Sequence, residues 1–259
     1  MRRALFMGFA LVAYAIFFAT FLYLIAFVAN WSLVPVTVDR GPPAPVATAI
    51  VVDLLLIALF GIQHSVMARQ GFKKAWTRIV PQPAERSVYV LAASAMLIVM
   101  MAFWRPIDAV MWSVTTPALA LLLWALFAIG WLVVLTTTFL LNHFELFGLQ
   151  QAWFHWRGRT AAPPQMRTPF FYKLVRHPLY SGFILAFWAI PTMTFGHLLL
   201  AAGMSAYILI AIGYEERDLS DLFGRDYDEY RTRVGMLAPG LLQEVLRRGG
   251  QVVGQLAHG

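Results

Sequence analysis

The chain has 259 residues, of which 60% are hydrophobic and only 13% are charged, and its formal net charge is +7. Soluble globular domains carry about 25% charged residues, so this composition excludes an ordinary soluble domain and predicts a membrane protein. The sequence contains no cysteine, which excludes disulfides, a cysteine nucleophile and a cysteine metal site.

Four long apolar segments dominate the first part of the chain, at residues 7–29, 46–61, 88–103 and 114–141. A helix needs about 20 mostly apolar residues to cross a bilayer, so we expect four spanning helices. The first segment is too long for a cleaved signal peptide, and no Ala-x-Ala-like site follows it.

The basic residues are unevenly distributed among the connecting segments. With a cytoplasmic N-terminus, the segments on the cytoplasmic side carry 18 of the 20 lysines and arginines. This is the positive-inside pattern, which accounts for the basic charge without a nucleic-acid partner. We therefore expect a bacterial inner-membrane protein with both termini in the cytoplasm.

The second part of the chain combines a polar connector with a broken apolar stretch. Residues 142–176 are long and aromatic, which favours a folded part of a site over a slack loop. Residues 178–212 are apolar but interrupted by "PTMTFGH", and each half is short for a separate span. We expect a helical hairpin here, followed by two amphipathic helices on either side of Gly224.

Two polar motifs bracket the hairpin, "RHPLYSG" before it and "YEERDL" after it. Glu215 or Glu216 can accept hydrogen bonds from hydroxyls or an amine. Arg176 or Arg231 can hold a carboxylate through a charge-assisted fork. Together these groups suit a zwitterionic ligand with a ribose. The alternative is that the first motif anchors a helix end at the interface and that the glutamates are simply solvated.

These motifs, with the continuation "EERDLSDLFGRDYDEYRTRV", resemble the isoprenylcysteine carboxyl methyltransferase-like superfamily of integral membrane methyltransferases. Its pattern is RHPxYxG, an apolar hairpin, then EExxLxxxFGxxYxxYxxxV, and the match covers residues 169–234. The resemblance implies that S-adenosylmethionine binds at the cytoplasmic face. It also implies a cofactor pocket formed by Arg176, His177, Pro178, Tyr180, Gly182, Tyr214, Glu215, Glu216, Tyr227, Tyr230 and Arg231.

Three earlier stretches narrow this resemblance. "QHSVMAR", "ERSVYVLAAS" and "LNHFELFGLQQ" are similar to the methanethiol S-methyltransferase branch, which is related to NnrU-type proteins. With them, the resemblance spans residues 1–236. That branch makes dimethyl sulfide from methanethiol and S-adenosylmethionine, so the resemblance implies a small thiol as methyl acceptor.

Polar residues lie at the cytoplasmic ends of two apolar segments. Polar groups in spanning helices are costly and are usually functional, so these residues are candidates for the acceptor site. A thiolate is the effective nucleophile, so an imidazole there can take the proton from a small thiol or orient it. We predict catalytic roles for His64, His143 and Asn142. We predict substrate contacts from Gln63, Ser65, Phe144, Phe147 and Trp153.

Alternatives stay open for the histidines and for the function. His64 can simply bond a neighbouring helix, and His143 can be a helix-end residue at the interface. The histidine spacing matches no metal-ligand signature, so no metal is expected. The acceptor can instead be an isoprenylcysteine carboxylate, a phospholipid or a larger thiol. A third hypothesis is a non-enzymatic NnrU-like membrane protein, and the oligomeric state is open.

The sequence thus predicts an all-α, polytopic integral membrane protein built as one integrated domain, with a cofactor site at the cytoplasmic face. Residues 1–141 are expected to form a four-helix transmembrane bundle. Residues 142–236 are expected to hold the substrate and cofactor segment, including the hairpin. Residues 237–259 look like a tail outside the resemblance. The expected partners are the lipid bilayer and a small thiol, and no nucleic acid.

Overall fold

The computed structural model describes residues 2–160 and 166–240. Within this part of the chain, five helices are long and apolar enough to cross a membrane. The prediction of a mostly helical, integral membrane protein is therefore confirmed. The tail expected at 237–259 lies outside the described residues from position 241 onward. The five long helices are α1 (Arg2–Val28), α2 (Val46–Ala68), α4 (Gln82–Phe103), α5 (Pro117–Leu141) and α9 (Phe195–Phe223).

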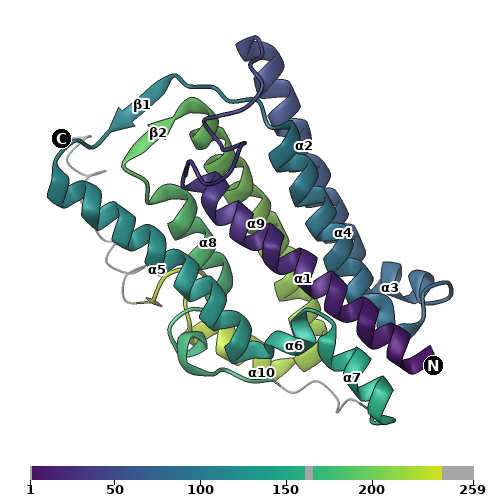
Figure 1. Cartoon of the computed structure of the whole chain (residues 1–259). Coiled ribbons are helices and arrows are strands. Elements are labelled where there is room, and N and C mark those ends of the chain that lie inside the picture. Colours follow the sequence, from purple (N-terminus) through teal and green to yellow (C-terminus); the bar gives the residue numbers. More distant parts are fainter. Residues whose placement is uncertain (1, 161–165, 241–259) are drawn as a thin grey trace.

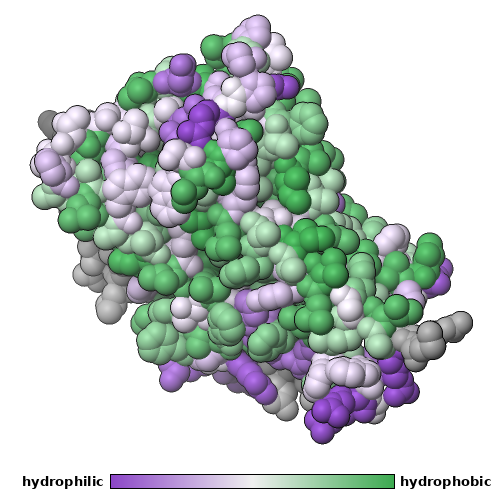
Figure 2. Space-filling model, in the orientation of Figure 1, coloured by the Kyte–Doolittle hydropathy of each residue, from purple (hydrophilic) through white to green (hydrophobic). Residues whose placement is uncertain are grey.

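The shorter elements collect at the two ends of the helical bundle (Figure 1). At one end, which we call the polar end, lie α3 (Gln70–Trp76), α6 (His143–Leu146), α7 (Leu149–Arg157) and α10 (Arg225–Arg233). The opposite end carries strands β1 (Val110–Ser113) and β2 (Thr192–Thr194). Figure 2 shows hydrophobic residues across the middle of the visible face, as expected where helices contact lipid.

The expected hairpin is present, but its two arms differ in length. Its first arm is α8 (Pro178–Trp188), and its second arm is the much longer α9. The apolar pattern ends near Ile212, whereas the helix continues through "YEERDLSDLF" because glutamate, arginine and leucine are good helix formers. It ends at Gly224, whose positive φ of 56° suits a glycine. The second arm is thus long enough to span a membrane.

A small antiparallel sheet closes the end of the bundle opposite the polar end. Val110 of β1 lies opposite Thr194 of β2, and Ser113 lies opposite Thr192. The pairing ties the connection between α4 and α5 to the turn of the hairpin. Strands this short are not visible in the sequence pattern, because they show too few alternating residues.

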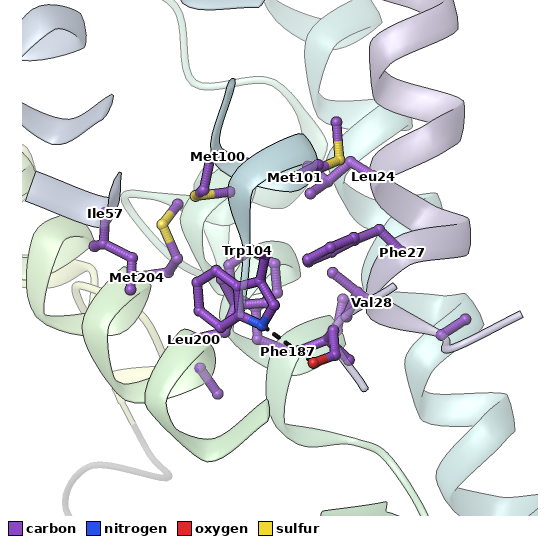
Figure 3. Close-up of a cluster of buried hydrophobic side chains, with 14 of the residues drawn as sticks. Leu24, Phe27, Val28, Ile57, Met100, Met101, Trp104, Phe187, Leu200 and Met204 are labelled. Carbon is purple, nitrogen blue, oxygen red and sulfur yellow. Dashed lines mark hydrogen bonds between the residues drawn. The ribbon is translucent and has the colours of Figure 1, made fainter. Parts of the chain in front are cut away.

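The main hydrophobic core lies between the helices and extends from this sheet along α9 to Ile212, near the polar end. Trp104, at the end of α4, is fully buried, and its indole N–H donates to the carbonyl oxygen of Val38 at 3.1 Å. Figure 3 shows this ring surrounded by side chains from several helices, among them Phe27, Phe187 and Leu200. The core therefore holds the helices together along the bundle, while the charged side chains of the two motifs lie at the polar end.

Helices α5 and α8 approach each other closely through two glycines. A Cβ atom at Gly130 would lie 2.7 Å from the backbone nitrogen of Ala186 and 2.8 Å from the carbonyl oxygen of Gly182. At Gly182, a Cβ atom would lie 2.7 Å from the carbonyl oxygen of Gly130. The contacting atoms belong to the backbone, so they cannot move aside as a side chain would. Glycine at both positions permits this packing.

We expect Gly130→Ala to lower the stability of the protein by about 2 kcal/mol, because the added methyl group overpacks the α5–α8 contact. The matched control is Gly213→Ala on α9, where nothing lies within 4 Å of the added atom. That change should be neutral or slightly stabilising. Thermal unfolding of the purified protein in detergent measures both effects. Equal melting temperatures for the two variants would contradict the packing argument.

Candidate active site

The hairpin is tied at the polar end to the chain that follows α10. The backbone N–H of Arg176 donates to the carbonyl oxygen of Gly235 at 2.8 Å. The N–H of His177 donates to the carbonyl oxygen of Met236 at 3.1 Å. Pro178 then begins α8, where its missing N–H leaves no donor unpaired. The "RHPLYSG" motif therefore starts a helix and also pairs with a distant segment.

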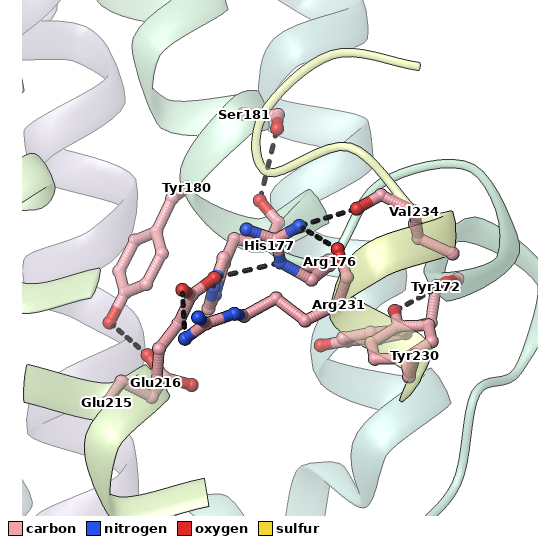
Figure 4. A network of polar contacts seen from close by, with 10 residues as sticks. All are labelled: Tyr172, Arg176, His177, Tyr180, Ser181, Glu215, Glu216, Tyr230, Arg231 and Val234. Atoms are coloured by element: carbon pink, nitrogen blue, oxygen red, sulfur yellow. Dashed lines mark hydrogen bonds and ion pairs between the residues drawn. The ribbon is translucent and has the colours of Figure 1, made fainter. Parts of the chain in front are cut away.

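The carboxylate of Glu216 is the centre of a charged network (Figure 4). Its Oε1 accepts from Nε of Arg176 at 2.8 Å and lies 3.1 Å from Nε2 of His177. Its Oε2 lies 3.9 Å from Nη1 of Arg231. Arg176 also donates to the carbonyl oxygens of Arg231 and Val234, at 3.0 and 2.5 Å. Arg176 is thus occupied by partners within the chain, whereas the Arg231 side chain is half-exposed.

Phenol groups surround this network. The hydroxyl of Tyr180 donates to Oε2 of Glu215 at 2.9 Å, and that of Tyr230 donates to the carbonyl oxygen of Tyr172 at 2.5 Å. The buried Tyr227 hydroxyl has no hydrogen-bond partner among the described residues. Burial raises the pKa of Tyr230 to about 12 and also raises the pKa of Tyr227. Both phenols are therefore protonated at neutral pH and can donate.

Two residues predicted to contact the cofactor lie elsewhere. Tyr214 is 45% exposed and faces the end of α2, where the guanidinium of Arg69 lies 5.1 Å from its ring centre. Gly182 is buried in the glycine contact between α5 and α8. The structure thus places Gly182 in helix packing, and it brings Arg176, His177 and Tyr180 into contact with Glu215 and Glu216.

A cavity of about 260 Å³ adjoins this network and is lined by residues of α1, α2, α4, α5, α6, α8 and α9. Most of its wall is apolar, with many aromatic rings. Tyr180 lines the cavity and bonds Glu215, so it connects the cavity to the charged network. The polar or charged side chains that line the cavity are His64, Arg86, Tyr89, Ser94, Thr138, His143, Tyr180 and Tyr207.

His64 reaches the cavity from α2. Its Nε2 lies 3.0 Å from the hydroxyl of Tyr89 on α4, and its ring stacks on Phe60 at 5.2 Å between ring centres. The guanidinium of Arg86 lies over the ring of Tyr89, 4.9 Å from the ring centre. His64 thus bonds a neighbouring helix and lines the cavity at the same time.

His143 reaches the cavity from α6, and its hydrogen bonds define which ring nitrogen carries the proton. The hydroxyl of Thr138 donates to the carbonyl oxygen of Leu135 at 2.7 Å, so it must accept from Nδ1–H of His143 at 2.8 Å. Nε2 is then unprotonated and accepts from the hydroxyl of Tyr14 at 2.7 Å. Burial lowers the pKa of His143, which keeps the imidazole neutral at pH 7.

Asn142, the third residue predicted to be catalytic, caps a helix. Its side-chain oxygen accepts from the backbone N–H of Glu145 at 3.3 Å, which caps α6. Its amide nitrogen donates to Oε1 of Gln150 at 2.5 Å, which joins α6 to α7. Asn142 does not line the cavity among the residues that the structure describes. Its contacts give it a part in positioning the neighbouring His143.

Of the five predicted substrate contacts, the structure places one on the cavity wall. Phe147 lines the cavity. Phe144 and Trp153 are exposed, at 54% and 36%. Gln63 donates to a methionine sulfur of its own helix. Ser65 lines a separate groove between α2 and α9. Of the residues predicted for the acceptor site, His64, His143 and Phe147 therefore line the cavity, and the rest of its wall comes from other residues of the chain.

Several cavity residues carry no assigned role in the sequence analysis. Tyr89 and Arg86 lie in the quoted stretch "ERSVYVLAAS", and Tyr207 lies inside the apolar part of α9. The available signal was a polar group within a spanning helix, which usually faces the bundle interior. Which helix each group faces depends on the rotation of the helices. Among the described residues, no group of three His, Asp or Glu side chains could hold a metal ion.

Comparison with known proteins reveals relatives along most of the chain. Methanethiol S-methyltransferase 1 of Bradyrhizobium diazoefficiens is 52% identical over 231 residues, which cover 89% of this chain and 81% of that protein. Methanethiol S-methyltransferase of Mycobacterium tuberculosis is 49% identical over 239 residues, or 92% of this chain and 98% of that protein. Human nurim is 33% identical over 190 residues, or 70% of each chain.

No protein-family model matches the chain, and no solved structure matches it.

Proposed function

Because the chain belongs to the methanethiol S-methyltransferase family, we propose that it transfers a methyl group from S-adenosylmethionine to methanethiol and produces dimethyl sulfide. The observation that carries this proposal is the high identity to proteins of that name over most of the chain. The small cavity beside a charged network supports it, since the reaction needs an apolar acceptor site next to a site for a zwitterion.

The residues at the polar end fit the proposed cofactor. The amino acid part of S-adenosylmethionine carries a carboxylate and an ammonium group. The half-exposed Arg231 can pair with the carboxylate, and Glu215, next to Glu216 in the sequence, can pair with the ammonium group. The buried hydroxyl of Tyr227, which lacks a partner among the described residues, is a free donor for a ligand. We propose that Arg176, His177 and Glu216 support this site through their contacts with one another, without touching the cofactor. When bound, S-adenosylmethionine supplies an activated methyl group on a positively charged sulfur.

The protein must hold the acceptor in line with that methyl group and exclude water. Alignment in a dry site supplies much of the rate of such a displacement. The aromatic wall of the cavity provides an enclosure of low polarity. Such an enclosure would favour the reaction of a thiolate with the cationic sulfur of the cofactor, because the two opposite charges are lost in that step.

His143 is the proposed acceptor of the thiol proton. Its neutral ring presents Nε2 to the hydroxyl of Tyr14, while Thr138 holds Nδ1–H. A thiol in the cavity can give its proton to Nε2, either in place of the Tyr14 hydroxyl or through it. His64, bonded to Tyr89, is the second candidate for this role.

We also propose that the polar end faces the cytoplasm of a bacterial cell. The connecting segments at this end carry most of the lysines and arginines, as the positive-inside rule requires. This orientation opens the proposed cofactor site to the compartment in which S-adenosylmethionine is made.

We expect the purified protein in detergent to release dimethyl sulfide from methanethiol and S-adenosylmethionine, measured by gas chromatography of the headspace. Parallel reactions contain a farnesylated cysteine carboxylate, phosphatidylethanolamine or butanethiol as the acceptor. Methylation of one of these in preference to methanethiol would reassign the acceptor. A folded protein that binds the cofactor and forms no dimethyl sulfide would contradict the proposal.

A further inference from the structure

The cavity lined by His64 and His143 has two exposed residues in its wall. Among the 25 described residues that line it, these two are Phe18 at 42% and Leu135 at 36%. Phe18 belongs to α1 and Leu135 belongs to α5, and both helices are of membrane-spanning length. The exposed part of the cavity wall therefore lies between two spanning helices.

The surroundings of this place are apolar. Along α1, Leu11 and Leu22 are also exposed, and along α5, Leu132 and Phe139 are. Such side chains offer no hydrogen bond to an ion or to a strongly hydrated molecule. Lipid chains are the natural neighbours of this surface, because it lies on the apolar helices that span the membrane.

The polar end of the cavity is covered instead. Nε of Arg86 on α4 donates to the carbonyl oxygen of Leu146 on α6 at 2.7 Å. The ring of Phe147, directly after α6, stacks on Phe17 of α1 with 4.0 Å between ring centres. These contacts hold α6 against α4 and α1, so α6 covers the cavity at the polar end.

We propose that the acceptor cavity opens laterally to the bilayer between α1 and α5, past Phe18 and Leu135. Methanethiol enters and dimethyl sulfide leaves by this route; the identity of these two molecules rests on the proposed function. Both are small, neutral and apolar, so they partition from water into hydrocarbon. The thiol proton is removed only inside the cavity, and no charge has to cross the opening.

A single introduced cysteine tests the route without requiring turnover. The chain has no cysteine, so Ser94→Cys places one thiol on the buried α4 wall of the cavity. The probe is methyl methanethiosulfonate, a small neutral reagent. The thiolate attacks its sulfenyl sulfur, an S–S bond to a CH3S group forms, and methanesulfinate leaves. Mass spectrometry of protein in liposomes gives the rate of modification.

The opening is narrowed by Leu135→Trp in the Ser94→Cys protein. The matched control is Leu132→Trp, which adds the same bulk to the same helix at an exposed residue that does not line the cavity. We expect Leu135→Trp to slow the modification several-fold and Leu132→Trp to leave it unchanged. A charged reagent, the trimethylammonium-ethyl methanethiosulfonate, should react far more slowly than the neutral one in both.

Two results would overturn the lateral route. One is equal modification rates in the Leu135→Trp and Leu132→Trp proteins, with both folded by circular dichroism. The other is modification by the charged reagent at the rate of the neutral one, which would show access from water. Neither readout depends on the methyl transfer. A failure to form dimethyl sulfide would therefore contradict the proposed function and leave the outcome for the route separate.

Discussion

Replacing Glu216 with alanine is expected to abolish binding of S-adenosylmethionine and to destabilise the protein. The Glu216 carboxylate holds both Arg176 and His177, at 2.8 and 3.1 Å. The side chains of Arg176 and Glu216 are only 11% and 13% exposed. Removing one partner of such a pair leaves a buried charge without compensation, which costs about 3–5 kcal/mol. The segment that Arg176 ties to Val234 would lose its anchor as well.

Isothermal titration calorimetry measures the binding, and thermal unfolding measures the stability. The matched variant is Glu215→Gln, next to Glu216, whose side chain can still accept from the Tyr180 hydroxyl. We expect it to keep the melting temperature of the unchanged protein while weakening the cofactor affinity. This contrast separates a carboxylate that contacts the ligand from one that builds the site. Full cofactor affinity in Glu216→Ala would show that the network is not the cofactor site.

His143→Ala is expected to spare cofactor binding and to lower kcat by about 100-fold, the usual contribution of a positioned general base. His64→Ala should likewise spare cofactor binding and lower the rate. Headspace chromatography gives the rates, and calorimetry gives the binding. If both variants keep full activity, neither histidine takes the thiol proton.

The pH dependence identifies which histidine is the base. The neutral imidazole is the active form, and burial lowers the pKa of His143 below its usual value of 6.5. Activity should therefore persist as the pH falls through 6.5 and decline only at lower pH. This acid limb should disappear in His143→Ala and persist in His64→Ala if His143 is the base. The opposite pattern would assign the role to His64.

A further pair of variants tests the positioning of the His143 ring. Thr138→Val removes the oxygen that accepts from Nδ1–H and frees the ring to exchange its protonated nitrogen. The matched control is Thr137→Val, because the buried Thr137 hydroxyl has no partner among the described residues. We expect a lower rate and an altered acid limb for Thr138→Val and an unchanged profile for Thr137→Val. Identical profiles would remove Thr138 from the site.

Much of the fold follows from the sequence because lipid imposes a simple condition on it. A spanning helix must be apolar over its length, so four segments could be located from hydropathy alone, and a broken fifth stretch predicted the hairpin. The length of α9 was less visible. Hydropathy stops where the polar residues begin, whereas the helix continues to Phe223 through residues of high helix propensity.

The proximity of the two charged motifs was also readable from the sequence. "RHPLYSG" and "YEERDL" lie at the two ends of one hairpin, so chain connectivity alone brings Arg176 and Glu216 together. Gly182 could not be assigned in this way. Its motif position fits a ligand contact, but the packing of α5 against α8 decides that it faces Gly130.

The lining of the cavity was decided by the tertiary structure. Sequence adjacency suggested Gln63, Ser65, Phe144 and Trp153, yet neighbours on a helix point in different directions, about 100° apart. The cavity wall is assembled instead from residues of seven helices, among them Tyr89, Thr138 and Tyr207. The sequence by itself determined a membrane-embedded helical protein and the two charged motifs of its polar end. Only helix packing decided which side chains enclose the cavity, because helix rotation and contact are long-range properties that hydropathy does not record.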